Sequence, residues 1–347
     1  MVNPPFGSVV MVTGASAGVG RATARAFAKK GARVGLLARG REGLEAALAE
    51  VKEAGGAGHI IQADVSDPVA VEAAAGELEG AFGPIDVWVN NAMVTVFAPF
   101  KEVSPDEFRR VTEVTYLGVV YGTMAALHSM LRRDQGIIIQ VGSALAYRSI
   151  PLQSAYCGAK HAIMGFTDSL RSELLHDRSI VKLSMVQLPA LNTPQFTWSR
   201  SRLPRKSQPV PPIFQPEVAA DAIVWLSEHP RRELSVGMPT LKAIWGQKFA
   251  PGFIDKYLAE TGYEGQQYDG PADPAQADNL WQALPGDYGA HGEFDDRAES
   301  SSLQLWLNKH RNLVGVVGSA LVAAAGTRML AGRRSSPKRE VAAQRRS

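Results

Sequence analysis

Short apolar runs alternate with longer amphipathic stretches between residue 9 and about residue 235. The stretches between the runs, such as 20–31 and 104–133, have the pattern of helices that bury one side. Strands that are apolar throughout and separated by helices form a parallel sheet that is covered on both faces. We therefore expect a doubly wound α/β domain over residues 1–240, with about seven strands: 9–12, 33–38, 59–62, 87–90, 136–141, 181–187 and 233–236.

The pattern loosens after the sixth predicted strand. Residues 193–216 are rich in proline and basic residues and lie on the side of the sheet where ligands bind, so they are a candidate substrate lid or an ordinary surface loop. Residues 241–260 are amphipathic but interrupted by Pro251 and Gly252, which predicts a C-terminal extension. Residues 261–300 are acidic, with a net charge of about −8, and rich in glycine and proline, which predicts a flexible linker.

The last segment, 301–347, combines an apolar stretch with a basic tail and has a net charge of about +8. Residues 313–327 carry no charge but fall short of the ~20 apolar residues that span a bilayer; counting to residue 331 comes near that limit. Three interpretations stay open: a helix docked on the parent domain or its dimer mate, a peripheral membrane anchor helped by the basic tail, and a short span. We expect a cytoplasmic protein, with membrane contact through 313–331 under the last two interpretations.

Composition limits the chemistry that the chain can perform. Of its 347 residues, 45% are apolar, enough for a large core, and the net charge of +3 argues against a general nucleic-acid-binding protein. Cys157 is the only cysteine, so no intrachain disulfide is possible and a reducing compartment is compatible. The seven histidines stand at no spacing typical of metal ligands, so we expect no metal site. The N-terminus lacks the regions of a signal peptide, so secretion is not expected.

The first predicted strand runs into the glycine-rich stretch TGASAGVG, residues 13–20. Gly14, Gly18 and Gly20 allow a tight turn, a close approach of backbone to a phosphate, and close packing of helix on strand. Unpaired N–H groups at the start of the following helix favour an anion. At the first strand–helix junction of an alternating chain, this stretch predicts a dinucleotide site.

The residues after the second predicted strand indicate which dinucleotide binds. An NAD enzyme usually has Asp or Glu there for the ribose hydroxyls, whereas this chain has Arg39 and Arg41 and no acid before Glu42. An arginine fork matches the 2′-phosphate of NADP, so NADP(H) is favoured over NAD(H); the alternative is that Arg39 only extends from a strand end into solvent. After the third predicted strand, Asp64 is a candidate partner for the adenine amine.

Ser143, Tyr156 and Lys160 form a candidate catalytic set. Tyr156 and Lys160 stand four residues apart in a predicted helix over 154–175, which puts them on one face, one turn apart. A free tyrosine hydroxyl titrates near ~10, and a lysine cation beside it favours the phenolate and brings the acid into working range. Ser143 follows the fifth predicted strand and can hydrogen-bond the same substrate oxygen.

Together these motifs resemble the short-chain dehydrogenase/reductase family over residues 5–240: Thr13-Gly14-x-x-x-Gly18-x-Gly20, Asp64, Asn90-Asn91-Ala92, Ser143 and Tyr156-x-x-x-Lys160 stand in the family's order and spacing. The resemblance implies a Rossmann-type fold, a nicotinamide cofactor, and hydride transfer to or from a carbon–oxygen bond. It implies that Tyr156 is the general acid/base, that Ser143 holds the substrate oxygen, and that Lys160 lowers the tyrosine pKa and binds the nicotinamide ribose. The cofactor-binding residues that it implies are Thr13, Gly14, Ser16, Gly18, Val19, Gly20, Arg39, Asp64, Val65, Asn91, Ala92, Tyr156, Lys160, Pro189 and Thr193.

The resemblance also implies a homodimer or homotetramer, often formed through the two long helices, and a small-molecule carbonyl or alcohol as substrate. Membrane contact would favour an apolar or lipid-like substrate. The chain departs from the family's pattern in three ways. First, Met93 replaces a glycine and can narrow the pocket. Second, Ala190 replaces a glycine, and Thr193 stands one residue earlier than the family's threonine that touches the cofactor.

The third departure, Thr115, concerns the mechanism, because the family commonly has an asparagine of the proton relay there. A threonine can hydrogen-bond back to the helix carbonyl four residues earlier and bend the helix. Two functions are therefore expected from the sequence. The first is an NADP(H)-dependent oxidoreductase that interconverts a carbonyl and an alcohol. The alternative is an NADPH-binding sensor or scaffold with weak or no turnover.

Overall fold

The seven predicted strands form one parallel sheet in the computed structural model, which describes residues 7–273 and 275–311. Their order is β11-β7-β6-β4-β1-β2-β3, and every neighbouring pair is parallel. The strands are β1 (Val9–Thr13), β2 (Arg33–Ala38), β3 (Ala57–Gln62), β4 (Val87–Asn90), β6 (Ile137–Val141), β7 (Lys182–Gln187) and β11 (Glu233–Ser235). The order reverses at β1 and β4, which places a crevice at their carboxyl ends. The doubly wound, Rossmann-type fold is confirmed.

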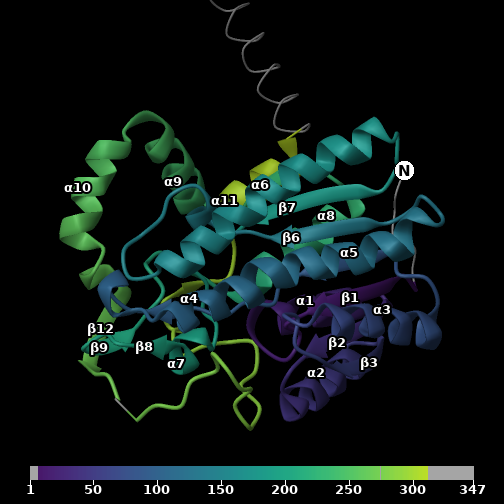
Figure 1. Cartoon of the computed structure of the whole chain (residues 1–347), viewed down its shortest axis with the longest axis horizontal. Helices are drawn as coiled ribbons and strands as arrows, with labels where there is room; N and C mark the ends of the chain where they lie inside the picture. The colour runs from purple at the N-terminus through teal and green to yellow at the C-terminus, as the bar shows by residue number, and fades with distance from the viewer. Residues whose placement is uncertain (1–6, 274, 312–347) are drawn as a thin grey trace, which may run out of the picture. The chain divides into compact units, whose positions relative to one another are not determined.

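Helices cover both faces of the sheet (Figure 1). One face carries α1, α2 and α8, with α1 packed on α8, and the other carries α3, α4, α5 and α6. Their bounds are α1 (Gly18–Ala28), α2 (Arg41–Glu53), α3 (Pro68–Phe82), α4 (Pro105–Thr112), α5 (Gly118–Leu131), α6 (Ser154–His176) and α8 (Pro216–Glu228). Because both faces are covered, the apolar strands are shielded from water on both sides.

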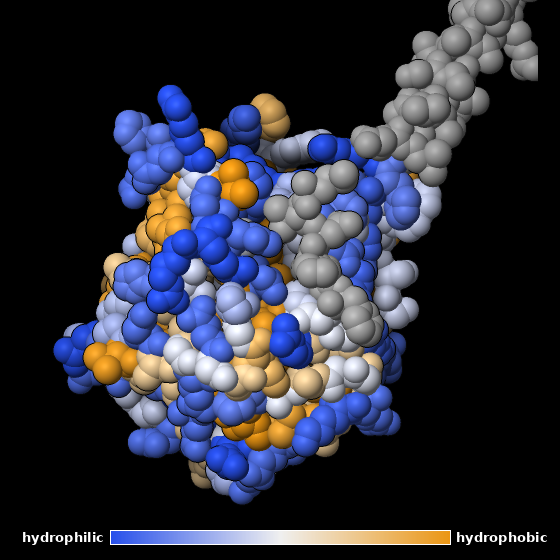
Figure 2. All heavy atoms as spheres, turned by 90° about the vertical axis from the view of Figure 1, so that its right-hand side faces the viewer, coloured by the Kyte–Doolittle hydropathy of each residue, from blue (hydrophilic) through white to orange (hydrophobic). Residues whose placement is uncertain are grey.

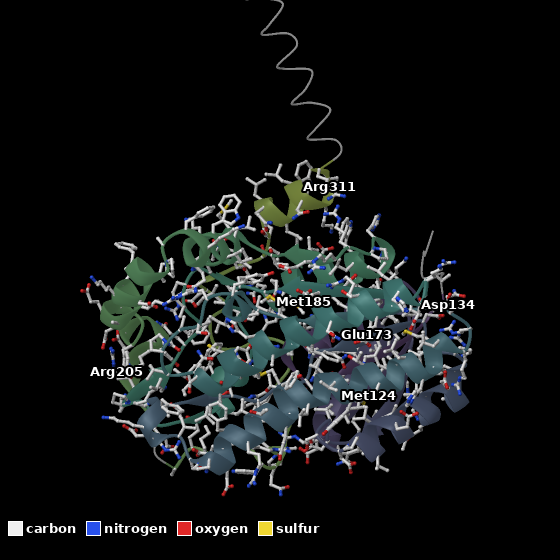
Figure 3. The ribbon with its side chains drawn as sticks, turned by 45° about the horizontal axis from the view of Figure 1, so that its top comes forward. Met124, Asp134, Glu173, Met185, Arg205 and Arg311 are labelled. Carbon is white, nitrogen blue, oxygen red and sulfur yellow. The ribbon has the colours of Figure 1, made fainter. Side chains whose placement is uncertain are left out.

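The core lies between the sheet and these helices. All five residues of β1 and all five of β6 are buried. Met185 on β7 packs against Val119 and Ile163 beneath α5 and α6, whereas Met124 points outward from α5 (Figure 3). Full burial of such an apolar side chain contributes roughly 1.5–3 kcal/mol to folding.

Helices α4 and α5 form one continuous segment, because a π-helical turn, η2 (Glu113–Leu117), joins them. Within the described part of the chain, this segment is the one helix long and apolar enough to cross a membrane, but 56% of its most apolar window is buried. α5 packs against α3, and α4 packs against α6, so the apolar residues serve the core of the domain. The apolar stretch 313–331 and the basic tail lie outside the described residues.

Two helices follow the last strand of the sheet, α9 (Met238–Phe249) and α10 (Pro251–Thr261), with a break at Ala250 where Pro251 predicts one. They form a hairpin at the left of Figure 1. Trp245 and Phe249 are exposed on it. On the side of the domain that Figure 2 shows, hydrophilic residues predominate and hydrophobic ones are dispersed in small groups.

Residues 261–300 are folded against the domain, in contrast to the flexible linker expected from their composition. They belong to the same compact unit as the sheet, which ends at Ser302. Acidic residues of this segment meet arginines of the domain, which offsets the low hydrophobicity that predicted disorder. The strands that tie it down are β12 (Gln267–Pro271), paired with β9 (Arg205–Ser207), and β13 (Ala298–Glu299), paired with β10 (Ile213–Phe214). Helix α11 (Leu303–Lys309) belongs to a second unit.

Glu107 anchors the proline-rich segment 193–216 to helix α4. Its carboxylate is 2% exposed and accepts hydrogen bonds from Arg200 at 3.0 Å and Arg202 at 2.6 Å. Its other oxygen accepts the N–H of Ser104 at 2.8 Å, which completes a capping box. Burial opposes ionisation, but the hydrogen bonds of Arg202 and Arg200 lower the pKa of Glu107 to about 2.

We expect Glu107→Gln to lower the free energy of unfolding by roughly 2–4 kcal/mol, because the amide leaves Arg202 without a charged partner and Arg200 with Asp278 alone. The folded pKa of about 2 lies below the ordinary 4.5, so the carboxylate's contribution is complete above pH ~4.5 and is lost as the pH falls toward 2. Urea unfolding of wild type and variant at a series of pH values measures both effects. Asp106→Asn, which removes an exposed partner of Arg109, is the matched control. An equal loss of unfolding free energy in Glu107→Gln and Asp106→Asn would contradict the anchoring role of Glu107.

Candidate active site

A cleft of about 430 Å³ runs along the carboxyl edge of the sheet, where parallel α/β sheets bind their ligands. Most residues that the sequence assigns to cofactor binding or catalysis line this cleft: Gly14, Ser16, Gly18, Val19, Arg39, Asp64, Val65, Asn91, Ala92, Ser143, Tyr156, Lys160, Pro189 and Thr193. Thr13, Gly20 and Thr115 do not line it.

The glycine-rich turn lets α1 approach β1 more closely than any side chain would allow. Gly14 and Gly18 have φ angles of +69° and +55°, which favour glycine. At Gly20, an added Cβ would lie 2.1 Å from the Gly14 carbonyl oxygen. Helix α1 begins at Gly18 with no side-chain cap, so no side chain of the turn occupies its first N–H groups, although that of Gly18 donates to the carbonyl of Gly289 at 3.1 Å. This cradle fits the phosphates of a dinucleotide.

Thr13 and Asn91 hold the ends of β1 and β4 together. The Thr13 hydroxyl accepts the N–H groups of Asn91 at 2.9 Å and Ala92 at 3.0 Å. The Asn91 side-chain amide donates to the Thr13 carbonyl at 2.9 Å. Thr13 thus braces the wall of the cleft instead of lining it, and its effect on a cofactor would be indirect.

Arg39 and Asp64 lie at one end of the cleft, next to the ends of β2 and β3. The Asp64 carboxylate accepts hydrogen bonds from Arg110 and from the N–H and hydroxyl of Ser66, the latter two at 3.0 Å and 2.8 Å. Burial raises the pKa of Asp64, but the hydrogen bonds from Arg110 and Ser66 outweigh it and leave the pKa below its ordinary value. No local sequence pattern indicated that Arg110 belongs to this site, because its partner Asp64 is 46 residues away.

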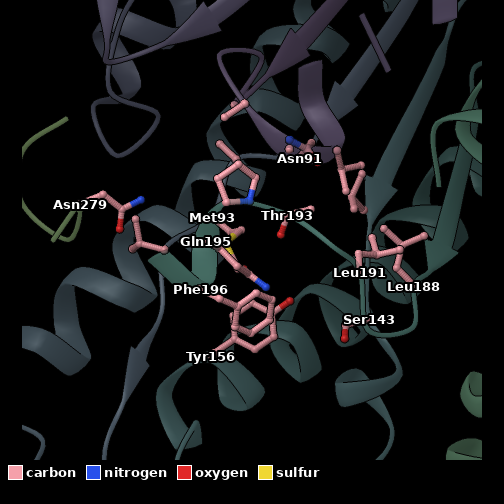
Figure 4. Close-up of a pocket in the computed structure, with 18 of the residues that line it drawn as sticks. Asn91, Met93, Ser143, Tyr156, Leu188, Leu191, Thr193, Gln195, Phe196 and Asn279 are labelled. Atoms are coloured by element: carbon pink, nitrogen blue, oxygen red, sulfur yellow. The ribbon is translucent and has the colours of Figure 1, made fainter. Parts of the chain in front are cut away.

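Ser143, Tyr156 and Lys160 meet elsewhere in the same cleft, where Figure 4 shows the first two. Ser143 follows β6 and caps the short helix η3 (Ala144–Ala146). Its hydroxyl lies near enough to Tyr156 to act on the pKa of the phenol. One turn along α6, the Lys160 ammonium donates to the Val141 carbonyl at 2.7 Å and lies 5.4 Å from the centroid of the Tyr156 ring. The three residues predicted from their spacing are therefore brought together.

Burial governs the protonation of Tyr156 and Lys160. Burial raises the pKa of the Tyr156 hydroxyl, and the nearby Ser143 hydroxyl acts in the opposite direction without outweighing it. Lys160 is 3% exposed, and burial lowers its pKa from 10.5 to about 8. The sequence interpretation, in which Lys160 lowers the pKa of Tyr156, differs from this structure, where the tyrosine pKa is raised.

Thr115 lies in the π-helical turn and is fully buried. Its hydroxyl donates to the carbonyl of Val94 at 2.9 Å and accepts the N–H of Val94 at 3.1 Å. The expected bond to the helix carbonyl four residues earlier is not the one it makes, although Thr112 makes such a bond to Phe108 at 2.9 Å. The hydroxyl proton of Thr115 is thus committed to the loop after β4.

The C-terminal segment supplies a wall of the cleft that the sequence did not predict. We call residues 278–289 the strap. Its acidic, glycine- and proline-rich sequence lacks helical or strand periodicity, and the local signal was the apolar pair Leu280 and Trp281, of which Leu280 is fully buried. The strap residues that line the cleft are Asn279, Ala283, Leu284, Gly286 and Tyr288.

The proline-rich segment 193–216 also lines the cleft, through Phe196, Trp198 and Val210 among others. The segment therefore lies where a substrate lid would lie, and its role as a lid stays a prediction. Its secondary structure consists of α7 (Gln195–Trp198), β9, β10 and β8 (Arg200–Ser201), which pairs with β5 (Val96–Phe97).

Other chemistry finds little support in the described residues. They contain no group of three or more histidine, cysteine or acidic side chains placed to hold a metal ion. Cys157 is buried, and burial raises the pKa of its thiol, so the thiol stays protonated at neutral pH. Its position beside Tyr156 therefore does not make it a nucleophile.

Comparison with known proteins identifies the family. The model of the short chain dehydrogenase family matches residues 8–203. The chain belongs to the short-chain dehydrogenase/reductase family. It is 34% identical over 280 residues to the uncharacterized oxidoreductase YxnA of Bacillus subtilis, covering 79% of this chain and 78% of that protein. It is 33% identical over 254 residues to 3beta-hydroxysteroid dehydrogenase 1 of Eggerthella lenta, covering 71% of this chain and 96% of that protein.

Solved structures of this family are similar in fold. An alcohol dehydrogenase from Thermococcus sibiricus, complexed with 5-hydroxy-NADP, is 29% identical with a TM-score of 0.57 and covers 66% of this chain and 95% of that one. A metagenomic short-chain oxidoreductase in complex with NADP is 28% identical, also with a TM-score of 0.57, and covers 67% of this chain and 98% of that one. The chain is thus an oxidoreductase of the short-chain dehydrogenase/reductase family.

Burial of Lys160 makes the stability of the domain depend on pH. Its folded pKa of about 8 lies below 10.5, so the unfolded state binds more protons between these values and wild-type stability rises with pH there. We expect a rise of about 2 kcal/mol between pH 7.5 and 9.5 that is absent in Lys160→Met. Urea unfolding at the two pH values measures the difference between the proteins. Lys242→Met, at an exposed lysine, should follow wild type, and a parallel course of Lys160→Met and wild type would refute the assignment.

Proposed function

We propose that the chain is an NADP(H)-dependent oxidoreductase that interconverts a carbonyl and an alcohol. The observation that carries the proposal is the meeting of Ser143, Tyr156 and Lys160 in the same cleft as the glycine-rich turn and Arg39. A proton donor, an oxygen-binding hydroxyl and a phosphate cradle on one continuous surface suit hydride transfer coupled to proton transfer.

The chain's own residues would bind the substrate oxygen and move its proton. Because burial raises its pKa, Tyr156 carries its proton at neutral pH, which is the form needed to protonate a reduced carbonyl. Ser143, which lines the same cleft as Tyr156, can hold the same substrate oxygen. The ammonium of Lys160 lies near enough to stabilise the phenolate left when the proton is given up. The bound nicotinamide cofactor supplies or accepts the hydride.

The preference for NADP(H) rests on the end of β2. Arg39 lines the cleft there, and no acidic residue precedes Glu42 to bind the ribose hydroxyls. Both similar solved structures hold NADP or 5-hydroxy-NADP. A guanidinium favours the dianionic 2′-phosphate that distinguishes NADP from NAD.

The substrate that fits best is an apolar carbonyl compound. Apolar side chains line the cleft, including Val94, Ile150, Leu188, Leu191 and Phe196. The similar protein from Eggerthella lenta acts, by its name, on a 3β-hydroxysteroid. Apolar pocket walls favour such substrates because they release water from both surfaces.

We expect Tyr156→Phe to lower kcat/KM by about 10²-fold to 10⁴-fold, because it removes the proton donor but keeps the ring. The decrease in NADPH absorbance, followed against a panel of apolar ketones and aldehydes with NADPH and NADH side by side, gives the rates and the cofactor preference. Tyr147→Phe is the matched control, since the Tyr147 hydroxyl donates to Glu233 and does not line the cleft. Equal rates in wild type and Tyr156→Phe on every substrate would refute the mechanism.

A second candidate function is an NADPH-binding sensor or scaffold with weak turnover. The observation that favours it is the Thr115 hydroxyl, whose proton is donated to the Val94 carbonyl and is therefore not available to a relay water. In this case Ser143, Tyr156 and Lys160 would be present, but reprotonation of the tyrosine would be slow.

Replacement of Thr115 separates the two functions. If the relay limits turnover, Thr115→Asn should raise kcat about tenfold or more, because a longer amide can reach a water molecule. Thr115→Ser keeps the hydroxyl bond to Val94 and should leave kcat unchanged. Tight NADPH binding by calorimetry, with no turnover in wild type and a gain in Thr115→Asn, would establish the sensor. Efficient turnover by the wild type, with no increase of kcat in Thr115→Asn, would exclude the sensor function.

A homodimer or homotetramer is the assembly proposed for this enzyme. Support comes from the exposed apolar side chains Met124 and Leu131 on α5 and Leu175 on α6. Helices α5 and α6 lie on the same face of the sheet, so a second copy could cover all three side chains together.

A further inference from the structure

The strap runs along the adenosine side of the proposed cofactor cleft, from Arg39 to the glycine-rich turn. Asn279, Leu284 and Gly286 line the same cleft as Arg39, Gly40 and Asp64. The strap is attached at its beginning by Asn279, whose N–H donates to the carbonyl of Trp198 at 3.0 Å, and by Asp278, which pairs with Arg200 at 2.9 Å. A part of the chain some 240 residues after Arg39 therefore forms one side of the nucleotide site.

Arg39 and Arg110 grip the first turn of the strap. The guanidinium of Arg39 donates to the carbonyls of Asn279 at 2.5 Å and Trp281 at 3.1 Å. Arg110 donates to the carbonyl of Leu280 at 3.0 Å, and the Leu280 side chain is fully buried. Arg39 is the side chain proposed for the 2′-phosphate, so strap carbonyls and phosphate use the same donors.

The other end of the strap is attached at the glycine-rich turn. The N–H of Gly18 donates to the carbonyl of Gly289 at 3.1 Å, and this N–H is among those that a pyrophosphate would use. Asp287 forms an ion pair with Arg21, which is 4% exposed. Between the two ends, the N–H of Gly286 donates to Glu42. The strap is thus held across the cleft at both ends by groups of the nucleotide site itself.

Asn279 has an unused hydrogen-bond acceptor. Its side-chain oxygen is buried and has no hydrogen-bond partner, while the side chain lies at the cleft (Figure 4). A buried acceptor without a partner costs roughly 1–3 kcal/mol, so a ligand that donates to it is favoured. The adenine amine is a donor of this kind. Asp64, the residue expected to bind this amine, already accepts three hydrogen bonds from Ser66 and Arg110.

We propose that the strap is a clasp on the adenosine half of NADP(H), which must open for the dinucleotide to enter or leave. This inference rests on the proposed cofactor, not on turnover. In the closed clasp, Asn279 accepts a hydrogen bond from the adenine amine, and the strap, held by Arg110 and Arg21, covers the nucleotide. The 2′-phosphate competes with strap carbonyls for Arg39, so binding of NADP(H) and opening of the clasp are coupled.

A disulfide across the mouth of the clasp tests whether it opens. A Cβ added at Gly40 would lie 3.4 Å from the Cβ of Ala283, near the separation of disulfide-bonded cysteines, and Gly40 has a φ of −87° that cysteine accepts. We expect Gly40→Cys/Ala283→Cys, oxidised after loading with NADPH, to release NADPH at least about tenfold more slowly than the reduced protein. Stopped-flow fluorescence during displacement by excess NADP measures the release.

The reduced double variant is the reference, and Gly40→Cys alone is the matched control: oxidation should leave the NADPH release rate of this single variant unchanged. Equal release rates in the oxidised and reduced double variant would overturn the clasp, and so would failure of the crosslink to form, because the strap would then not lie over Gly40. Absence of NADPH binding in wild type would overturn both the clasp and the proposed cofactor. Binding without turnover would count against the proposed enzyme alone.

Loss of one attachment tests the clasp without new cysteines. Asp287→Asn removes the ion pair with Arg21 and should speed NADPH release about fivefold, as expected for a partly exposed ion pair. Glu293→Gln makes the same charge change in the same segment, at a residue whose partner is the Tyr268 hydroxyl, and should leave release unchanged. Equal rates in wild type and both variants would contradict the closing role of the Arg21 pair and the clasp with it.

Discussion

The contact between helix α1 and the turn after β1 is the constraint on which the nucleotide site depends. Gly20 has no room for a side chain, because an added Cβ would lie 2.1 Å from Gly14 and 2.7 Å from Asn91. This close packing sets the first N–H groups of α1 at the crevice between β1 and β4 and joins the ends of these strands through Thr13 and Asn91. Larger residues at Gly20 would displace the helix, and the phosphate cradle with it.

The fold and the catalytic set could be predicted because both depend on patterns among residues that are close together in the sequence. Strand–helix alternation predicts a parallel sheet, and a separation of four residues on one helix predicts that Tyr156 and Lys160 share a face. Ser143 stands at the end of a strand, where side chains of parallel sheets converge. The protonation of these groups could not be predicted in the same way. It depends on burial by residues from several elements, and burial raised the tyrosine pKa that the spacing alone predicted to fall.

The strap and the role of Thr115 could not be predicted, because their contacts join residues far apart in sequence. Arg39 meets Asn279 across 240 residues, and Thr115 meets Val94 across 21. Local composition led to a wrong prediction for residues 261–300. This segment is acidic and lacks apolar periodicity, which predicts a linker, yet its acidic side chains form ion pairs with Arg21 and Arg200. The sequence feature that could have indicated this contact was the opposite charge of the acidic segment and of the arginines it meets.

The strap is joined to the second unit by a short length of chain that contains β13. After residue 289 the chain passes to β13, where Ala298 and Glu299 pair with Ile213 and Phe214, and the second unit begins at Leu303. Tension transmitted along the backbone from that unit would load this two-residue pairing first, then the contacts of residues 290–297 with Asn192 and Glu217, and the strap only after them. A tether or binding partner acting on the C-terminal unit would thus pull on the nucleotide site through the covalent chain, with β13 as the element that yields first.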